Sequence, residues 1–344
     1  MIKLYSIEES KKWDEVVCSF QDWDVYYLSG YVKAFQIHGD GIPFLLYYSG
    51  NGLRAIFVYM RRETVLQEVY DSITPYGYGG VLFEGDTSEA NLRVFWSEYV
   101  AKMEDECIVD SFVRYHPVLR NADYMRVVSD VIDLGKTIAI ELTSPEVIWE
   151  NIISKNRNMI RKAEKNGIEI RHGKEWPLFD DFRSIYNATM DKDHAEEYYY
   201  FRERFYESIH RDLNDHYEMF YAVLNGKIIA MSIILYGNRQ MHYHLSGSLL
   251  EYRNLAPSNL LLYKAALWGC EQGFKTFHLG GGVGSGEDSL YKFKSAFNKN
   301  SNYQFSIGKQ VFNQEKYDEL VMIRMRSDES FDMDSHYFPL YRTL

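Results

Sequence analysis

The sequence is poor in cysteine and proline and has no long apolar run. Its three cysteines, Cys18, Cys107 and Cys270, lie far apart without a CxxC spacing. This pattern excludes a disulfide framework and favours reduced, mostly buried thiols in a cytoplasmic protein. The longest apolar run, residues 228–236, is too short to span a bilayer, and residues 1–13 lack the apolar core of a signal peptide. We therefore expect a cytoplasmic protein without integral membrane association.

Positive charge is also scarce. The formal net charge is −11, and a field of that sign works against broad contact with DNA, RNA or anionic membranes. One basic face is expected at helical spacing within residues 154–167. Its members are Lys155, Arg157, Arg161, Lys162 and Lys165. This face could meet the phosphates of a nucleotide-sugar or an RNA, or it could be an ordinary solvated helix surface.

Aromatic residues, in contrast, are abundant. They make up 16% of the chain, and tyrosine alone occurs 29 times. Tyrosine gives rigid contact area with a polar tip, which suits sugar or peptide ligands. A tyrosine-rich core and surface would produce the same composition.

The order of elements predicts a mixed α/β protein with two similar halves. A length of 344 residues is typical of two domains, and the order of helix, strand meander, helix and strand restarts near residue 137. The predicted domains are residues 1–136 and 137–326, and residues 327–344 are a C-terminal tail that packs back on the first domain. Single helices are expected at 6–20 and 144–166, the former capped by Ser6 and Glu9.

A glycine-rich stretch, FHLGGGVGSGEDSLYKFKSAF (residues 277–297), is the first candidate site. A Walker-type phosphate loop requires Lys after its last glycine, but Gly286 is followed by Glu287, and no dinucleotide-binding register fits. The preceding strand would therefore end in backbone that approaches a ligand closely or turns sharply. An ordinary loop is the alternative.

The residues after the glycines add a lysine. A short helix or a turn is expected over residues 289–297, with Lys294 just beyond the glycines. A lysine there could neutralise a phosphate or stabilise a developing oxyanion, or it could be a solvated surface lysine.

The strand MHYHLSGS (residues 241–248) places His242 and His244 on one face. Two histidines at this spacing can share a metal ion, but no third ligand falls at a matching spacing. We therefore expect no metal site and interpret the strand as ligand-facing or as a half-buried sheet face.

A further motif joins that strand to the next helix. GNAT-superfamily acetyltransferases bind the pyrophosphate of coenzyme A here with R/Q-x-x-G-x-G/A, through free amides at a helix N-terminus. This chain has Arg253-x-x-Ala256-x-Ser258, followed by Asn259, and Pro257 removes one amide donor. The motif is a degenerate copy that supports the topology more than coenzyme A as the donor.

Several segments together resemble the Fem-like proteins, which are tandem GNAT-fold enzymes named for the synthesis of peptidoglycan interpeptide bridges. The resemblance covers nearly the whole chain and is most specific from about residue 140 to 315. The segments that carry it are KNRNMIRKAEKNGIEI, YNATM, YHLSGS, NLAPSNLLLYKAALWGCEQGFKTFHLGGG and DSLYKFKSAF, with TPYGYGG and FVRYHP in the N-terminal half. His278 precedes the glycines where many relatives are expected to have aspartate, and no long heptad segment matches the helical arm of some members.

The resemblance implies two tandem GNAT-like domains, each with a mostly antiparallel mixed sheet flanked by helices, and a substrate groove between them. It implies transfer of an acyl or aminoacyl group onto an amine of a peptidoglycan-like precursor, in a ternary complex without a tightly bound cofactor. The cosubstrate is acyl-CoA or aminoacyl-tRNA. The family's Phe-Lys pair, associated with the aminoacyl-tRNA end, maps onto Phe293 and Lys294.

From these features we expect Lys294 and nearby amides to stabilise an oxyanion, and the strand end Gly280, Gly281 and Gly282 to let the donor lie close to the main chain. His244 and Asp288 are candidates to relay a proton, as is the substrate itself. The residues expected to line the acceptor groove are Tyr76, Tyr78, Tyr198, Tyr199 and Tyr291.

Two other functions stay open from the sequence. One is acyl-CoA-dependent N-acylation of an amino-sugar nucleotide for surface polysaccharide. The other is a non-catalytic binding protein that keeps the fold, for which the degenerate Arg253–Ser258 motif is the main argument. The sequence does not indicate an oligomeric state.

Overall fold

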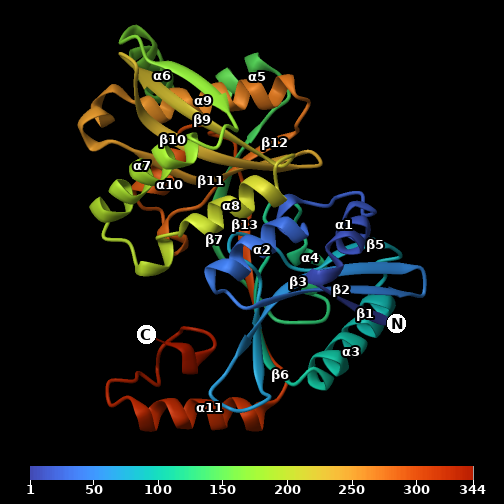
Figure 1. Cartoon of the computed structure of the whole chain (residues 1–344). Coiled ribbons are helices and arrows are strands. Elements are labelled where there is room, and N and C mark those ends of the chain that lie inside the picture. The colour runs from blue at the N-terminus through green and yellow to red at the C-terminus, as the bar shows by residue number, and fades with distance from the viewer. Residues whose placement is uncertain (344) are drawn as a thin grey trace. The chain divides into compact units, whose positions relative to one another are not determined.

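The computed structural model describes residues 1–343, which form two compact units. The first unit comprises residues 1–134 and the described residues from 305 on, and the second comprises residues 135–304. The chain passes from one unit to the other within two strands, β7 (Val131–Glu141) and β13 (Tyr303–Val311). Figure 1 labels most of the elements of both units.

The first unit contains a mostly antiparallel sheet in the order β1-β2-β3-β4-β6-β13, with β5 paired to β3. Among its described strands, only β4 and β6 run parallel. The strands besides β13 are β1 (Ile2–Ser6), β2 (Ile42–Gly50), β3 (Leu53–Glu63), β4 (Tyr70–Ile73), β5 (Leu82–Gly85) and β6 (Ile108–Arg114).

Helices cover this sheet, and the core is rich in aromatic residues. Phe57 of β3 and Phe95 and Tyr99 of α3 pack in one buried cluster. The helices are α1 (Ser10–Cys18), α2 (Ser29–His38), α3 (Glu89–Asp105), α4 (Ala122–Met125) and α11 (Gln314–Ser327), with short 3₁₀ turns η1 (Ile7–Glu9), η2 (Val25–Tyr27) and η6 (Leu340–Arg342).

The second unit repeats this plan with the order β7-β12-β11-β10-β9-β8, in which β11 and β12 are the parallel pair. Strand β10, KIIAMSIILYG, is buried over most of its length, as its run of β-branched residues predicts for a central strand. The new strands are β8 (Glu169–Gly173), β9 (Tyr217–Leu224), β10 (Lys227–Gly237), β11 (Gln240–Ser248) and β12 (Thr276–Gly280).

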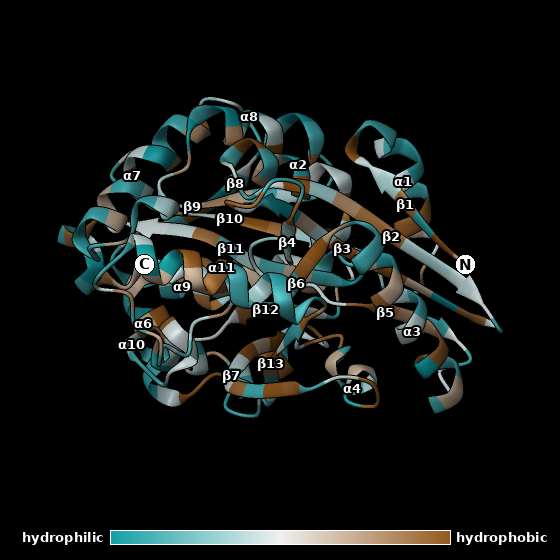
Figure 2. Ribbon diagram, turned by 90° about the horizontal axis from the view of Figure 1, so that it is seen from below, coloured by the Kyte–Doolittle hydropathy of each residue, from teal (hydrophilic) through white to brown (hydrophobic). Residues whose placement is uncertain are grey.

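Two layers of helices flank the second sheet. α9 contacts β9, β10 and β11 and packs against α5 and α6, whereas α7 packs against β10 and β11 (Figure 1). Hydrophobic residues concentrate along strands such as β10, and α7 and α8 are largely hydrophilic (Figure 2). The helices are α5 (Pro145–Asn151), α6 (Ser154–Lys165), α7 (Leu178–Lys192), α8 (Glu203–Asp212), α9 (Pro257–Glu271) and α10 (Ser289–Ser295), with 3₁₀ turns η3 (Glu197–Tyr199), η4 (Leu250–Leu255) and η5 (Val283–Ser285).

Corresponding hairpins in the two units use the same turn chemistry. Asn51 and Gly52 join β2 to β3 with φ of 51° and 75°, and Asn225 and Gly226 join β9 to β10 with φ of 50° and 79°. Consecutive positive φ angles define the type I′ turn, which Asn-Gly favours. The mixed α/β architecture and its duplicated order are therefore those that the sequence predicts.

Both single-helix predictions were wrong in detail. Residues 2–6 form a strand, because they pair with β2, and Ile7–Glu9 form the 3₁₀ turn η1. The α-helix therefore begins only at Ser10, and Ser6 makes no side-chain capping bond. The helix expected over 144–166 breaks at Ile152 and Ile153, which have extended backbone. A tertiary hydrogen bond from Ile153 N to Ala296 O, 3.1 Å long, holds this break.

The predicted second domain boundary also differs from the structure. Residues 305–326 were assigned to the C-terminal domain, but they group with the first unit. The reason is long-range: β13 pairs with β6, and Leu320 and Val321 of α11 pack on Val109.

Cysteine and tyrosine are placed differently from what composition suggested. Cys18 and Cys107 are exposed and Cys270 is half-buried, which contradicts the expectation of buried thiols. Several tyrosines are completely buried. Among the largest buried side chains are Tyr27, Tyr31, Tyr48, Tyr59, Tyr206 and Tyr217. Much of the aromatic content therefore serves the two cores.

Gly247→Ala should destabilise the second unit. A Cβ at Gly247 of β11 would lie 2.8 Å from both Ile185 O and Tyr186 Cα of α7, so the helix has to move. We expect a loss of about 1–3 kcal/mol in the free energy of unfolding, measured by urea denaturation. Gly286→Ala is the matched control, because its Cβ would meet only Val283 O at 3.5 Å. Equal stability of the two variants would contradict the packing described.

Candidate active site

The sheet of the second unit divides where the β11–β12 ladder ends. These parallel strands pair over three rungs, the last of which joins His242 to His278. Among the described residues they do not pair further, although β11 continues to Ser248 and β12 to Gly280. We call this point the strand fork. Beyond it, the backbone groups on the facing edges are not used by the β11–β12 ladder, so a ligand can bond to them.

A β-bulge on each strand lies just beyond the fork. His244 is the extra residue where β11 pairs with β10, and Leu279 is the extra residue where β12 pairs with β7. A bulge bends its strand and leaves one residue unpaired. Because each bulge lies on the outer side of its strand, the two bends account for the end of the pairing.

The glycines after β12 are required by the backbone. Gly280 has φ of 79°, a conformation that side chains disfavour. A Cβ at Gly282 would collide with the Asp288 carboxylate and with the carbonyl of Gly286. The glycine run therefore forms a tightly turned connection, and Gly281 lies at its start.

Lys294 lies against this turn. It is only 9% exposed, and its Nζ donates to the Gly281 carbonyl at 2.7 Å. Burial lowers the pKa of Lys294 to about 8, although the nearby Asp288 carboxylate opposes the shift. Among the described residues, Gly281 O is its one hydrogen-bond acceptor, so an ammonium with three donors keeps two for a ligand. The structure brings together the lysine and glycines singled out in the sequence.

Asp288 has a structural role in this arrangement. Its Oδ1 accepts from Tyr291 N at 2.8 Å and its Oδ2 accepts from Val283 N at 3.2 Å. The Tyr291 bond caps α10, and these backbone bonds lower the pKa of Asp288. A carboxylate with depressed pKa is a weak proton acceptor at neutral pH, so we leave Asp288 out of the proposed chemistry.

The N-terminus of α9 is the second structural feature of the site. Ala256 precedes it in the left-handed conformation, with φ of 59°, and no side chain caps it. Pro257 has no N–H, so Ser258 and Asn259 supply the amides of the first turn. The side chain of Asn259 is already used, because it donates to Asn156 Oδ1 at 2.7 Å.

Part of the basic face of α6 borders that N-terminus. Lys162 Nζ donates to Asn254 O at 2.6 Å, which ties α6 to the turn η4. Arg253 of η4 is exposed. Arg157 and Arg161 instead lie over the ring of Trp149, at 6.0 and 5.1 Å from its centroid. Two residues of the predicted basic face, Arg157 and Arg161, therefore contact Trp149, whereas Lys162 lies near the N-terminus of α9.

His242 and His278 of the fork are buried, whereas His244 is half-buried. His278 Nε2 and Thr137 Oγ1 are 2.9 Å apart, and the rings of His242 and His278 are nearly perpendicular, with centroids 5.9 Å apart. Burial, with a smaller contribution from His242, lowers the pKa of His244 to about 3. His244 is therefore neutral at physiological pH and a weak base, which disfavours it as a proton relay.

The other predicted residues of the second unit lie in two places. Phe293 and Tyr291 of α10 are partly buried and pack against the core, so Phe293 contributes to holding Lys294 in position. Tyr198 and Tyr199 lie at η3, where their rings contact each other edge to face at 5.5 Å.

Tyr76 and Tyr78 belong to an aromatic cluster of the first unit. The ring of Tyr76 stacks on Phe35 at 5.6 Å, and its carbonyl accepts from the Tyr31 hydroxyl at 2.5 Å. Tyr78 contacts the ring of Phe305 at 5.4 Å. Both are half-buried, so core packing accounts for much of their surface.

The corresponding strands of the first unit stay paired. β4 and β6 pair through Ile73–Phe112, and the pairing continues as Thr74 N donates to Phe112 O and Gly79 N donates to Arg114 O. Glu89 occupies the first turn of α3, where a carboxylate would repel phosphate. These two differences assign the candidate donor site to the second unit.

Sequence reasoning missed the residues that hold the site in place. Thr137 and Asn156 are both buried; Thr137 contacts His278, and Asn156 Nδ2 donates to Ala296 O at 3.2 Å while accepting from Asn259. An Asn within an otherwise basic helical segment was the available signal for Asn156.

The family comparison defines the class of protein. Residues 154–295 match the model of the family described as an acetyltransferase (GNAT) domain. This segment contains α6, the fork, α9 and Lys294. The protein is accordingly an acyltransferase, which disfavours the non-catalytic alternative.

Solved structures extend the likeness to both units. FemX superposes with a TM-score of 0.69 at 13% identity, covering 92% of this chain and 99% of that one. A conserved protein of unknown function from Bacteroides thetaiotaomicron gives 0.62 at 12% identity, covering 90% and 99%. The C-terminal domain of a protein described as a lysylphosphatidylglycerol synthetase from Agrobacterium fabrum gives 0.58 at 14%, covering 92% and 96%.

These likenesses concern the fold. They confirm the expected tandem GNAT-like architecture and the resemblance to Fem-like proteins. No curated protein matches the sequence. Among the described residues, no helix has the length and apolar character needed to cross a membrane.

Lys294→Met should alter the pH dependence of stability. Because the pKa of Lys294 is lower in the folded protein (about 8) than in the unfolded chain (10.5), the unfolded state binds more protons between these pH values. Stability conferred by Lys294 therefore rises with pH in this window, by at most about 1.4 kcal/mol per pH unit.

The measurement is urea denaturation at pH 8, 9 and 10. The difference in the free energy of unfolding, wild type minus Lys294→Met, should grow with pH. Lys292→Met, on the same helix but exposed, should give a difference that does not change with pH. A flat Lys294→Met difference would show that Lys294 titrates normally.

Proposed function

We propose that the protein transfers an acyl or aminoacyl group onto an amine of a cell-envelope precursor such as a peptidoglycan-like peptide. The donor would bind at the strand fork of the second unit, and donor and acceptor would be bound together. The observation that carries this proposal is the conjunction of three features within one unit: the fork after His242–His278, the uncapped N-terminus of α9, and Lys294 on the Gly281 carbonyl.

The reaction is attack of a neutral amine on the carbonyl carbon of an ester or thioester. A C–N bond forms, negative charge develops on the carbonyl oxygen, and the C–O or C–S bond to the carrier then breaks. Lys294 has two donors for the oxyanion in a site of low dielectric constant, where such an interaction is strong. Backbone amides beyond the fork would hold the donor as an additional strand-like segment.

The proton of the attacking amine needs an acceptor. His244 is a weak base because its pKa is lowered to about 3, and Asp288 is occupied by backbone donors. We therefore propose that the leaving group of the donor takes the proton, as thiol or hydroxyl. The acceptor amine must then bind in its neutral form, so the rate of transfer depends on the pKa of that amine.

The carrier of the acyl group is proposed to bear phosphate. The first-turn amides of α9 and the helix dipole favour an anion, and exposed Arg253 and Lys162 of α6 lie at the same turn. Coenzyme A and the end of a tRNA both present phosphates. GNAT domains generally use acyl-CoA, whereas aminoacyl-tRNA follows from the Fem-like resemblance.

A second candidate has its own support. The α9 motif and the GNAT-domain match favour an acyl-CoA-dependent N-acyltransferase, whose acceptor could be an amino-sugar nucleotide of surface polysaccharide. In either case Tyr198 and Tyr199, at the half-exposed turn η3, are proposed acceptor contacts.

Lys294→Ala should lower the turnover number by roughly 10²–10³, the usual cost of removing one oxyanion donor. Lys292→Ala is the matched control and should keep wild-type turnover. Single-turnover assays with donor and acceptor amine would measure the chemical step. If Lys294→Ala and Phe293→Ala both kept full turnover, the assignment of this site would be wrong.

Calorimetry should distinguish the two carriers. We expect either acetyl-CoA or a charged CCA-end mimic to bind, and Arg253→Ala to weaken that binding by the loss of one phosphate contact. Arg171→Ala, which removes an exposed cation of β8, is the control. Tight binding of coenzyme A would favour the acyl-CoA enzyme, and binding of neither donor would contradict the proposed site.

A further inference from the structure

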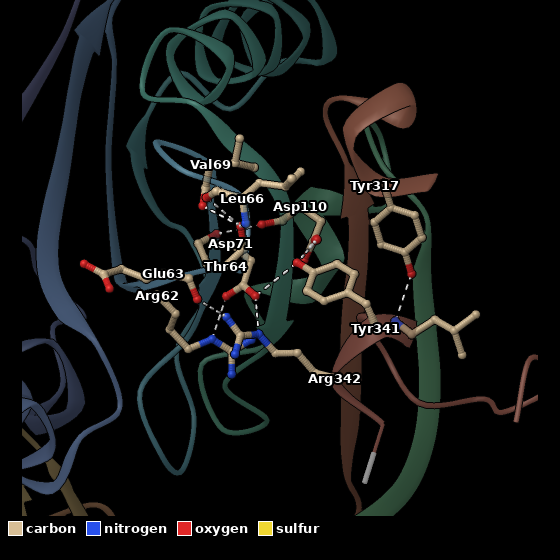
Figure 3. Close-up of polar contacts among 12 residues, drawn as sticks. Arg62, Glu63, Thr64, Leu66, Val69, Asp71, Asp110, Tyr317, Tyr341 and Arg342 are labelled. Carbon is tan, nitrogen blue, oxygen red and sulfur yellow. Dashed lines mark hydrogen bonds and ion pairs between the residues drawn. The ribbon is translucent and has the colours of Figure 1, made fainter. Parts of the chain in front are cut away.

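Two aspartates are buried side by side in the first unit. Asp71 of β4 and Asp110 of β6 (Figure 3) are register partners on neighbouring parallel strands, and both have 0% exposure. Like charges opposite each other destabilise a sheet, and burial raises the cost of an unpaired charge. Two ionised carboxylates here would therefore need strong compensation.

Asp71 has the partners of an ionised carboxylate. Arg62 Nε on β3 donates to its Oδ1 at 2.6 Å, and Arg342 Nε of η6 donates to its Oδ2. Figure 3 shows both guanidinium groups directed at this side chain. Charge-assisted bonds of this kind offset the desolvation of one negative charge.

Asp110 has the partners of a protonated carboxyl. Its Oδ1 is buried without a hydrogen bond among the described residues, and its Oδ2 lies 2.6 Å from the Tyr341 hydroxyl oxygen. That oxygen also lies 3.1 Å from Asp71 Oδ2. A phenol has one hydrogen, so it can donate to only one of the two carboxyls.

A proton on Asp110, in addition to the phenol hydrogen of Tyr341, makes the contacts of Tyr341 with both carboxyl groups favourable. If Asp110 carries it on Oδ2, the carboxyl O–H donates to the Tyr341 oxygen, and the Tyr341 O–H donates to Asp71. The electrostatics agree: burial and the charge of Asp71 raise the pKa of Asp110 to about 8. The charged or titratable groups that face Asp110 are Asp71, Arg62, Tyr317, Tyr341 and Arg342.

The residues that cover this pair come from the C-terminal end of the chain. We call residues 340–343 the C-terminal strap. Leu340 N donates to the Tyr317 hydroxyl of α11 at 3.0 Å, Arg342 Nη2 donates to Glu63 O at 2.6 Å, and Arg324 Nη2 donates to Thr343 O at 3.0 Å. The strap is thus held by polar contacts to β3 and α11 and by the aspartate pair.

We infer that the C-terminal strap is a proton-dependent latch on the first unit: it closes over a protonated Asp110 and an ionised Asp71, and opens as Asp110 gives its proton to solvent. This device is independent of the proposed transfer reaction. It couples the docking of the chain's C-terminal segment to the pH around the protein.

The sign of the coupling follows from the two protonation states. With the strap docked, Asp110 keeps its proton up to about pH 8. Release of the strap removes Tyr341 and Arg342, which lower this pKa, but it also admits water and so removes desolvation, the largest cause of the shift; the pKa therefore falls toward the ordinary value of 3.8. Between these values the docked state holds about one extra proton. Docking therefore weakens with rising pH, by up to about tenfold per pH unit.

Hydrogen exchange of peptides covering residues 336–343 tests this inference on the full-length protein from pH 5.5 to 9. After division by intrinsic exchange rates, protection in the wild type should fall by up to about tenfold per pH unit between about pH 6 and 8. Asp110→Asn mimics the protonated carboxyl, since its amide donates to Tyr341, and should give constant protection. Asp332→Asn, the same substitution at an exposed position, should behave as wild type.

Two results would overturn the latch. One is protection in the wild type that does not change with pH, and the other is the same pH slope in Asp110→Asn. Should Asp110→Asn fail to fold, Tyr341→Phe decides the question. It removes the hydroxyl between the carboxyls while keeping the ring against Leu320 and Val321, so protection at pH 6 should fall well below the wild-type value, and unchanged protection would refute the inference.

Discussion

The end of pairing between β11 and β12 after the His242–His278 rung is the constraint on which the candidate site depends. Two bulges, at His244 and Leu279, bend the strands away from each other. The glycine turn that follows β12 can then approach α10, and its carbonyl at Gly281 fixes the buried ammonium of Lys294. The first unit shows the alternative outcome, because β4 and β6 stay paired and present no such edge.

Much of the fold follows from local sequence. The Asn-Gly turns, the β-branched run of β10 and Pro257 at the start of α9 are all patterns of local sequence, and each accompanies the element that it favours. The predictions that were wrong concern elements that depend on long-range contacts. The edge pairing of residues 2–6, the break at Ile152 and the return of β13 to β6 each depend on a partner distant in sequence, which periodicity does not report.

The site was predicted in part, for a similar reason. Lys294 and the glycines lie close in sequence, so their proximity could be inferred, and the resemblance to Fem-like proteins sharpened it. Chemical roles were harder to assign, because they depend on burial and on partners. Asp288 caps α10, and His244 is neutral because desolvation lowers its pKa. The Asp71–Asp110 pair spans 39 residues of sequence, and no pattern joins its members.

A hydrogen-exchange footprint of the donor tests the central claim, that the second unit binds the acyl carrier at its strand fork. With saturating acetyl-CoA or a charged CCA-end mimic, protection should increase in residues 243–248 and 279–294 and in the first turn of α9, while residues 70–80 and 108–116 of the first unit stay unchanged. Protection confined to the first unit's β4 and β6 would contradict the account.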